Sequence, residues 1–441
     1  MIKSNIVINL LNKNIINIKN SLYFLAPSVL ELLISLVTFP IFSRNLSPYD
    51  FSVIGYYESI NQIFLPIMNL SFYVYYMKDF FKRTPEENKR VLISLMLFLS
   101  GTNLLIISLG FVLLHVYFKL AQVTFPIFPY ALLSLSSLYF TLYGSFLGIE
   151  YKMNREGLKF FLLMSISALL ALSVSLFLVV NLDFGAMGRM SGIVISQLAI
   201  GVFAFKVLYK KVDFDFNIIK KALRFGYPLI IIAFLDFPTV YIDRIILERQ
   251  NDIANFALYS IGLKMAGFVF MLGSSVYQAF EPDFYKFASQ KNIGRFIQSV
   301  LLVFGFLFGV NIVFTFISKP VVEFLTSGRY TGAYQYANLI IWSNFFLLLS
   351  YLLGVILIVQ NKTKILLYRK IIMAFFGVTM FVLLISRWQF IGAAYARIII
   401  NSLNCFILII FIIGSSDTIK NLIKNHFKKF LNKIDNGKIG E

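Results

Sequence analysis

The sequence predicts an all-α polytopic membrane protein with twelve transmembrane helices in two six-helix lobes related by a parallel internal repeat. Of its 441 residues, 59% are hydrophobic and only 14% are charged, and the mean hydropathy is +0.79. A soluble domain has about 25% charged residues. Long apolar runs recur along the chain, and the basic residues gather in the short connections between them. This composition excludes an ordinary soluble enzyme.

Twelve apolar segments are long enough to cross a bilayer, which takes about 20 residues in a helix. Polar stripes at helical spacing run along several of them, as on helix faces that turn toward protein or water. In chain order, the predicted spans cover residues 21–43, 51–77, 91–118, 121–148, 158–181, 185–208, 223–247, 255–280, 296–318, 335–360, 365–386 and 390–413.

The basic residues alternate between the two sides of the predicted membrane. With the N-terminus placed in the cytoplasm, 30 Lys and Arg lie in inner segments, seven in outer loops or span ends, and three inside spans. Cytoplasmic loops carry the excess of basic residues, and one missed helix would invert every later loop. We therefore expect both termini to be cytoplasmic. The net charge of +19 then indicates contact with anionic membrane lipids, and no nucleic acid is expected.

Cofactor, metal and disulfide chemistry has little support in the sequence. The chain has one cysteine, Cys405, which excludes an intrachain disulfide, and its two histidines, His115 and His426, are far apart. It has no Gly-rich phosphate-binding signature. We expect no cofactor, no metal site and no catalytic residues.

Similar segments occur in the two halves of the chain. Pro27 and Pro228 open the first and seventh spans, and a Phe-Pro pair follows in each. Gly-Ala pairs at residues 185–186 and 392–393 open the sixth and twelfth spans. Each half begins and ends in the cytoplasm, so the repeats are parallel. The predicted division is an N-lobe over residues 1–215, a C-lobe over 216–414 and a basic cytoplasmic tail over 415–441.

Several charged residues fall inside the predicted spans. Each costs about 2.5–3.5 kcal/mol at the bilayer centre, so such residues pair, face water or serve function. Glu31 and Asp236 lie near the middle of their spans. The charged residues singled out within the spans are Glu31, Glu58, Arg189, Asp236, Asp243, Arg244, Lys264 and Arg397.

Glu58 and Lys264 lie at nearly the same depth in the second helix of each half. Two interpretations fit this opposite-charge pair. It acts either as an outer gate that opens when substrate competes for Lys264, or as a static ion pair.

One stretch of the sequence resembles a known transporter family. Residues 241–247 (YIDRIIL), followed by Phe256 to Ser260, are similar to the seventh–eighth helix signature of Wzx-type bacterial polysaccharide (O-antigen) flippases. The Gly-Ala openings and the exit from span four at residues 148–151 are also similar to family features. These flippases belong to the MOP exporter superfamily and have a MATE-like fold.

The resemblance implies flipping of an undecaprenyl-diphosphate-linked oligosaccharide to the outer leaflet of the bacterial inner membrane. The diphosphate needs cationic partners and the sugar needs polar ones. The resemblance further implies a polysaccharide polymerase and a chain-length regulator as partner proteins. The candidate substrate-binding residues are Lys264, Arg397, Arg189, Arg244, Asn401, Asn404 and Gln62.

The resemblance also implies coupling to a proton or sodium gradient. A carboxylate held at the membrane midplane can carry the ion. The candidates for coupling or gating are Glu31, Glu58, Asp236 and Asp243.

The sequence is also compatible with two other functions. A MATE-type antiporter of organic cations has the same fold and would use an acidic, aromatic cavity. A polytopic glycosyltransferase or polymerase needs catalytic residues on sizeable outer loops, and the predicted outer loops are short.

Overall fold

The computed structural model describes residues 23, 26–27, 29–209, 214–289, 293–359 and 363–415. All secondary structure in this part of the chain is helical, as predicted. The start of the first span and residues 416–441 of the predicted tail lie outside the described residues.

Long helices account for most of the described chain. Residues 29–45 are helical. The later elements are α2 (Pro48–Asn69), α3 (Phe72–Lys78), η1 (Phe80–Lys82), α4 (Pro85–Ala121), α5 (Tyr130–Met153), α6 (Gly157–Leu176), the π-helical turn η2 (Phe177–Asn181), α7 (Gly185–Leu208), α8 (Phe216–Phe234), α9 (Phe237–Val240), α10 (Ile242–Glu248), α11 (Ile253–Ser289), α12 (Ile293–Leu325), α13 (Ala333–Val359) and α14 (Thr363–Ser415).

Eight helices in the described part of the chain are long and apolar enough to cross a membrane. One of them, α14, covers the last two predicted spans and has a non-helical residue between them, Gln389 (φ 50°, ψ −128°). Predicted span two is broken where Leu70 and Ser71 have positive φ. Span seven is divided into α8, α9 and α10. The total of twelve spans stays a prediction.

The predicted start of span four is wrong. It was placed at residue 121, but α4 continues to Ala121 and α5 begins only at Tyr130. Gln122 ends α4 in the left-handed conformation (φ 49°). Pro126 and Pro129 then lie in the connection, where the missing amide hydrogens prevent a continuous helix.

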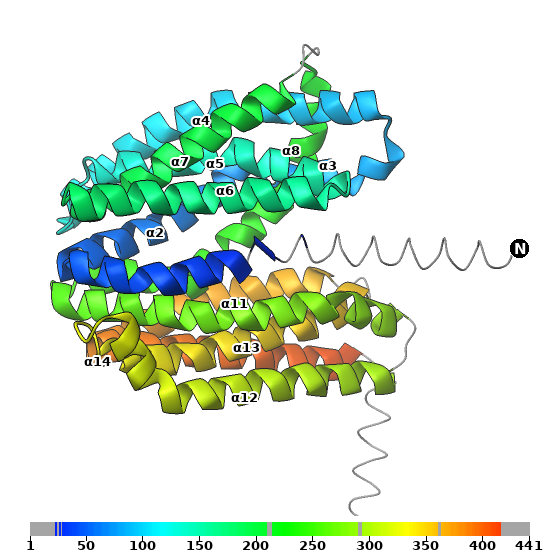
Figure 1. Ribbon diagram of the computed structural model, residues 1–441. Coiled ribbons are helices and arrows are strands. Elements are labelled where there is room, and N and C mark those ends of the chain that lie inside the picture. The colour runs from blue at the N-terminus through cyan, green and yellow to red at the C-terminus, as the bar shows by residue number, and fades with distance from the viewer. Residues whose placement is uncertain are drawn as a thin grey trace, which may run out of the picture.

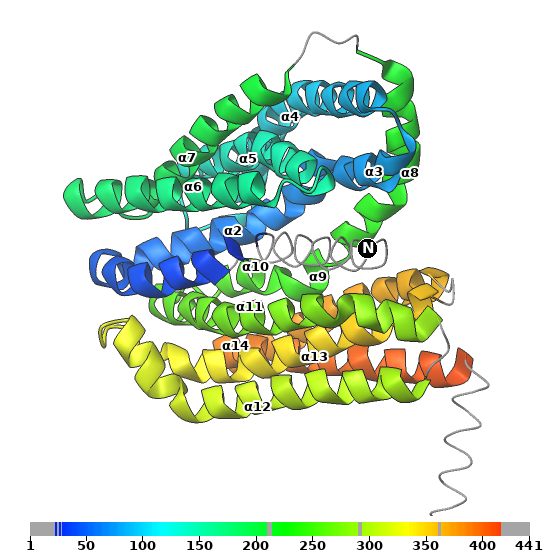
Figure 2. The ribbon, with the colours of Figure 1, turned by 45° about the vertical axis from the view of Figure 1, so that its right-hand side comes forward.

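The helices lie in two groups (Figures 1 and 2). The first group contains the helix over residues 29–45 and α2–α7; the second contains α11–α14. Between them, α2 packs against α10 and α11, while α8 packs against α3 and α4 of the first group. The predicted lobe boundaries and the repeat stay predictions.

The two groups are joined at one end of the bundle. We call this contact the seam; it connects residues 43–58 and 117–124 with residues 244–256 and 325–330. Arg44 Nε donates to Ser327 Oγ (2.8 Å), and Tyr330 Oη donates to the Leu46 carbonyl (2.8 Å). Thr124 N donates to Glu248 Oε1 (2.6 Å). Within the described residues, every hydrogen bond between residues 29–209 and residues 236–415 lies in the seam.

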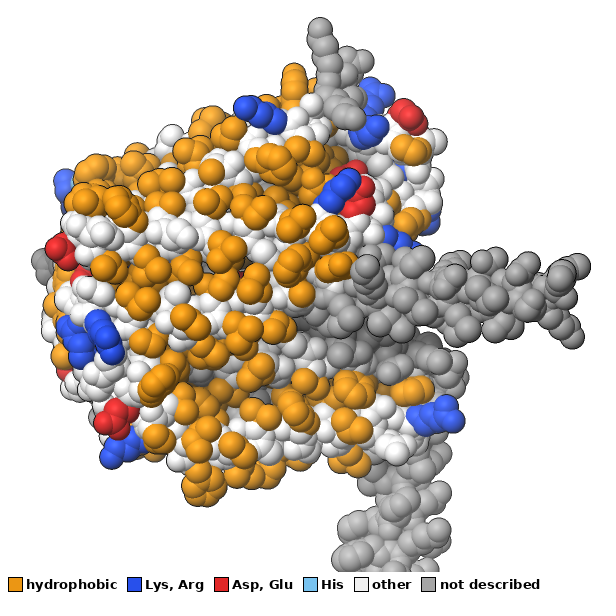
Figure 3. All heavy atoms as spheres, viewed as in Figure 1, with side chains coloured by type: hydrophobic (Ala, Val, Ile, Leu, Met, Phe, Trp, Pro, Cys, Tyr) orange, Lys and Arg blue, Asp and Glu red, His pale blue; other side chains and the backbone are white. Residues whose placement is uncertain are grey.

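The outer face of the bundle is apolar at mid-height. In Figure 3, hydrophobic side chains cover a broad band, and most charged side chains lie toward the two ends of the helices. Leu105, Leu109 and Leu113 on α4 are each more than 60% exposed. Such a surface is stable in lipid, and the chain is a multi-pass membrane protein.

Asp50 connects the starts of two helices. Its Oδ2 accepts from Ser47 N (2.8 Å) and Ser47 Oγ (2.6 Å) in the cap of α2, and its Oδ1 accepts from Ala186 N (2.6 Å) in α7. Capping and charge-assisted bonds of this kind each contribute about 1–2 kcal/mol.

We expect Asp50→Ala to lower the free energy of unfolding by about 2–3 kcal/mol, because three donors lose their acceptor. Thermal denaturation of the purified protein in detergent measures this effect. Glu86→Ala is the control, because Glu86 is exposed in the first turn of α4. Equal melting temperatures for the two variants would contradict the role of Asp50.

Candidate functional site

A cavity lies beside the seam, between the two groups of helices. It contains about 590 Å³ of empty space, part of which is open to solvent. Its walls come from the helix over residues 29–45, α2, α7 and α11. The lining residues are Ser35, Thr38, Phe39, Phe42, Leu46, Phe51, Ile54, Gly55, Glu58, Arg189, Ser260, Ile261 and Lys264.

Two of the predicted substrate-binding cations line this cavity. Lys264 is exposed to the cavity although it lies deep in the bundle, and its ammonium is in electrostatic range of Arg189, Arg244, Glu58 and Glu31. The Arg189 guanidinium lies 4.6 Å from the centre of the Phe42 ring, which holds the cation without neutralising it. The cavity therefore presents cationic groups and hydroxyls on an apolar floor.

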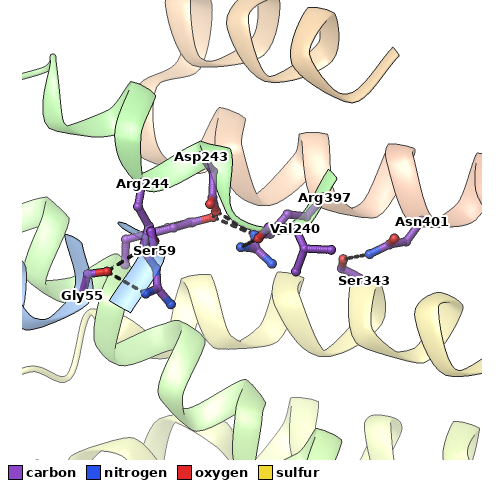
Figure 4. Close-up of polar contacts among 9 residues, drawn as sticks. Gly55, Ser59, Val240, Asp243, Arg244, Ser343, Arg397 and Asn401 are labelled. Carbon is purple, nitrogen blue, oxygen red and sulfur yellow. Dashed lines mark hydrogen bonds and ion pairs between the residues drawn. The ribbon is translucent and has the colours of Figure 1, made fainter. Parts of the chain in front are cut away.

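Glu58 also lines the cavity, but its ion-pair partner is Arg244. Arg244 Nη1 lies 3.2 Å from Glu58 Oε2, with which it forms an ion pair. The same nitrogen also donates a hydrogen bond to the Gly55 carbonyl oxygen (2.7 Å). Figure 4 shows Arg244 reaching across from α10 to Gly55 on α2. The predicted Glu58–Lys264 pair thus shares a cavity without forming a direct ion pair here, and Lys264 remains accessible to an anion.

Asp243 and Arg397 form a buried ion pair behind the cavity. Arg397 Nε lies 2.7 Å from Asp243 Oδ2 and 3.1 Å from Tyr259 Oη, and Tyr259 also donates to Asp243. Asp243 is fully buried. Arg397 donates to the Val240 carbonyl as well, so it ties α14 to the short helices α9 and α10 (Figure 4). In this conformation, the pair holds the broken seventh span in place.

The predicted amides lie outside the cavity lining. Asn401 is buried and donates to Ser343 Oγ (2.8 Å), which joins α14 to α13 (Figure 4). Asn404 on α14 and Gln62 on α2 are half-buried. Glu31 is exposed on the first helix.

Asp236 lies at the break between α8 and α9, where it pairs with Lys370 of α14. Lys370 Nζ is 2.7 Å from each of the two carboxylate oxygens. The Asp236 side chain is 47% exposed and that of Lys370 is 23% exposed. A solvent-accessible carboxylate on a broken helix is a suitable place for a proton or a competing ligand.

Sequence reasoning missed several residues of these clusters. Lys370 was counted with an inner loop, Tyr259 was noticed only as part of a family signature, and Glu248 was not selected. The Glu248 carboxylate is buried in the seam, 4% exposed, and accepts from Thr124. A helical register of α11 places Tyr259 one turn from Phe256, but only the folded chain places it beside Asp243.

The arrangement suits non-covalent binding of an anion. Two cations with free access, hydroxyls and aromatic walls can hold a diphosphate attached to a polar group. No group of three or more His, Cys, Asp and Glu side chains in the described residues could hold a metal ion.

The fold is that of two groups of solved transporters. The structure matches "Lipid II flippase MurJ, inward closed conformation" with a TM-score of 0.67 and 14% identity over 90% of this chain and 87% of that chain. It matches an inward-facing multidrug resistance MATE transporter of the MOP superfamily with a TM-score of 0.62 and 12% identity, over 90% and 95% of the two chains. A Vibrio cholerae MATE transporter, VcmN, matches with a TM-score of 0.58 and 15% identity, over 91% and 98%. The predicted MATE-like fold is confirmed.

The sequence itself matches a family profile. No curated protein matches the chain. The profile for "Polysaccharide biosynthesis protein" covers residues 18–277, which is more than half of the chain. This confirms the resemblance to polysaccharide flippases of the MOP superfamily, and the chain belongs to the polysaccharide biosynthesis protein family.

Proposed function

We propose that the protein flips an undecaprenyl-diphosphate-linked oligosaccharide repeat unit from the cytoplasmic to the outer leaflet of the bacterial inner membrane. The product would serve O-antigen, capsule or exopolysaccharide synthesis. The observation that carries the proposal is the cationic cavity between the two helix groups, where Lys264 and Arg189 face open space. The family membership supports a glycan substrate.

The position of the seam supports alternating access. With both termini in the cytoplasm, as the basic residues predict, the seam lies on the outer side of the membrane. The cavity is then closed to the outside and faces inward, which is the state that would receive substrate from the cytoplasm. Flipping would require the seam to open and the other end to close. No covalent bond is made or broken, so the chain would act without catalytic residues.

The ion gradient would act through carboxylates that can change partners. Asp236 is the strongest candidate, because it is solvent-accessible and paired with a single lysine. Glu31 is exposed on the first helix, and Glu58 is paired at the cavity wall. Asp243 would serve as a structural anchor in the inward-facing state and as a gating residue only if Arg397 releases it. A polysaccharide polymerase and a chain-length regulator would act on the flipped product.

We expect Lys264→Ala to abolish transport, because the exposed ammonium of the cavity is lost while no described ion pair is broken. In a strain lacking the protein, wild type should restore surface glycan and clear the lipid-linked repeat units that accumulate inside. Lys264→Ala should leave both defects. Lys319→Ala, which removes an exposed basic residue of α12, is the control and should complement fully.

A multidrug antiporter is the second candidate, because MATE transporters share the fold. Sensitivity of the deletion strain to cationic dyes, with unchanged surface glycan, would establish this alternative and overturn the flippase proposal. The cationic lining of the cavity argues against a cationic substrate, since like charges repel.

A further inference from the structure

Arg369 is a buried cation with unsatisfied donors. It lies on α14 and is only 7% exposed. Its Nε and Nη1 atoms are buried and have no hydrogen-bond partner among the described residues. Leaving guanidinium donors unsatisfied in such a place is costly, and buried charges are normally paired or bound to a ligand.

The neighbouring Lys370 takes up the nearest carboxylate. Both oxygens of Asp236 bind the Lys370 ammonium at 2.7 Å. The Asp236 carboxylate is also in electrostatic range of the Arg369 guanidinium. Within the part of the chain that the structure describes, two adjacent cations therefore share one carboxylate, and one positive charge is left without a counter-charge.

This cluster is open to a ligand. The Asp236 side chain is 47% exposed, and Tyr351 is 47% exposed beside it. The first part of α14 packs against α9, where the Gly377 backbone approaches the Pro238 carbonyl closely enough that a Cβ would lie 2.9 Å from it. The break between α8 and α9 thus leaves Asp236 at the edge of the packed region.

The cluster and the seam lie at opposite ends by the predicted topology. The distribution of basic residues places the start of α14, with Arg369 and Lys370, on the cytoplasmic side, whereas the seam lies on the outer side. A lipid-linked substrate arriving from the cytoplasm would meet Arg369 and Lys370 before it reached Lys264.

We propose that Arg369 and Lys370 form an anion site that receives a diphosphate on the cytoplasmic side. The Asp236 carboxylate stays paired with the Lys370 ammonium until the diphosphate displaces it. A diphosphate has the charge and the oxygen atoms to satisfy both cations. The inference that this diphosphate belongs to a lipid-linked glycan rests on the proposed function. The inference of an anion site at Arg369 and Lys370 is independent of that function.

The test is diphosphate binding to the full-length protein in nanodiscs, with inorganic diphosphate as the soluble probe and undecaprenyl diphosphate as the lipid probe. We expect Arg369→Gln and Lys370→Gln to weaken binding about tenfold or more, since each removes a charge-assisted bond. Asp236→Asn should tighten binding, because it removes the competing carboxylate. Arg387→Gln is the matched control on the same helix, with an exposed side chain, and should bind as wild type does.

The binding measurements can also contradict the proposal. Unchanged or weaker binding by Asp236→Asn would overturn the displacement. If Arg369→Gln only lowers the melting temperature, and Arg369→Lys restores it without any change in affinity, Arg369 has a structural role and the site is refuted. Equal competition by phosphatidylglycerol would assign the site to phospholipid headgroups instead. Arg369-dependent diphosphate binding in a protein whose deletion leaves surface glycan intact would support the site and overturn the flippase proposal.

Discussion

Asp243→Ala is expected to lower the free energy of unfolding by about 3–5 kcal/mol, the largest effect of any single substitution considered for this protein. The carboxylate is fully buried, and its removal leaves the Arg397 guanidinium buried without its counter-charge. Tyr259 loses its acceptor at the same time. A large fraction of the variant should therefore fail to reach the membrane in folded form.

Replacing both members of the Asp243–Arg397 pair distinguishes the effect of an unpaired buried charge from the effect of altered packing. Asp243→Leu combined with Arg397→Met replaces the ion pair with apolar groups, and buried pairs replaced in this way often retain stability. We expect the double variant to fold better than either single variant, as measured by fluorescence-detected size exclusion of the detergent-solubilised protein. If both single variants are as stable as wild type, the pair does not anchor α10 to α14.

Gly55→Leu is expected to open the seam and stop transport. A Cβ at Gly55 would lie 2.5 Å from Ser260 Oγ and 3.0 Å from Ser260 Cβ, so α2 and α11 cannot approach as they do now. The Gly55 carbonyl also accepts from Arg244, and a displaced α2 would break this bond. The population should shift away from the closed-seam conformation while each helix group stays folded.

Cross-linking measures this shift. In a Cys405→Ser background, cysteines at Thr124 and Asn251, whose side chains are hydrogen-bonded across the seam, should be joined by a short bismaleimide in the otherwise wild-type protein. Gly55→Leu should reduce the cross-linked fraction several-fold. Gly101→Leu is the control, because nothing lies within 4 Å of a Cβ at that position on α4. Equal cross-linking in the two variants would show that the close approach at Gly55 is not required.

Local patterns in the sequence predicted the helical fold well. The apolar runs located the long helices because the bilayer sets both their length and their composition. The sixth span was placed at residues 185–208, the bounds of α7. Errors arose where the backbone leaves the helix within an apolar run, as at Leu70 and Ser71 in the second predicted span. Apolar composition is the same on both sides of such a break, so hydropathy does not reveal it.

The partners of the charged residues were less predictable. Asp243 was predicted as a charged residue of the seventh span, but nothing in the sequence indicated that its partner is Arg397, 154 residues later. Asp236 was recognised as an intramembrane carboxylate, whereas Lys370 looked like one more basic residue of an inner loop. Ion pairs between residues that are far apart in the sequence depend on how the helices pack against one another. A single sequence does not show which helices are neighbours, so these partners could not be predicted from it.

Opening the seam in the proposed transport cycle requires free energy, because its hydrogen bonds must be broken. Many of its acceptors are main-chain carbonyls, including those of Ser43, Leu46, Gly55 and Ile253. Water can replace such partners when the seam opens, so each bond contributes only about 0.5–1.5 kcal/mol net. The twelve hydrogen bonds that cross the seam between described residues are then worth about 6–18 kcal/mol together, several times the roughly 2.3 kcal/mol that one charge gains in crossing a membrane potential of 100 mV. In the proposed transport cycle, one proton or sodium ion would therefore offset only part of the cost of opening the seam, and contacts formed at the opposite end would have to supply the rest.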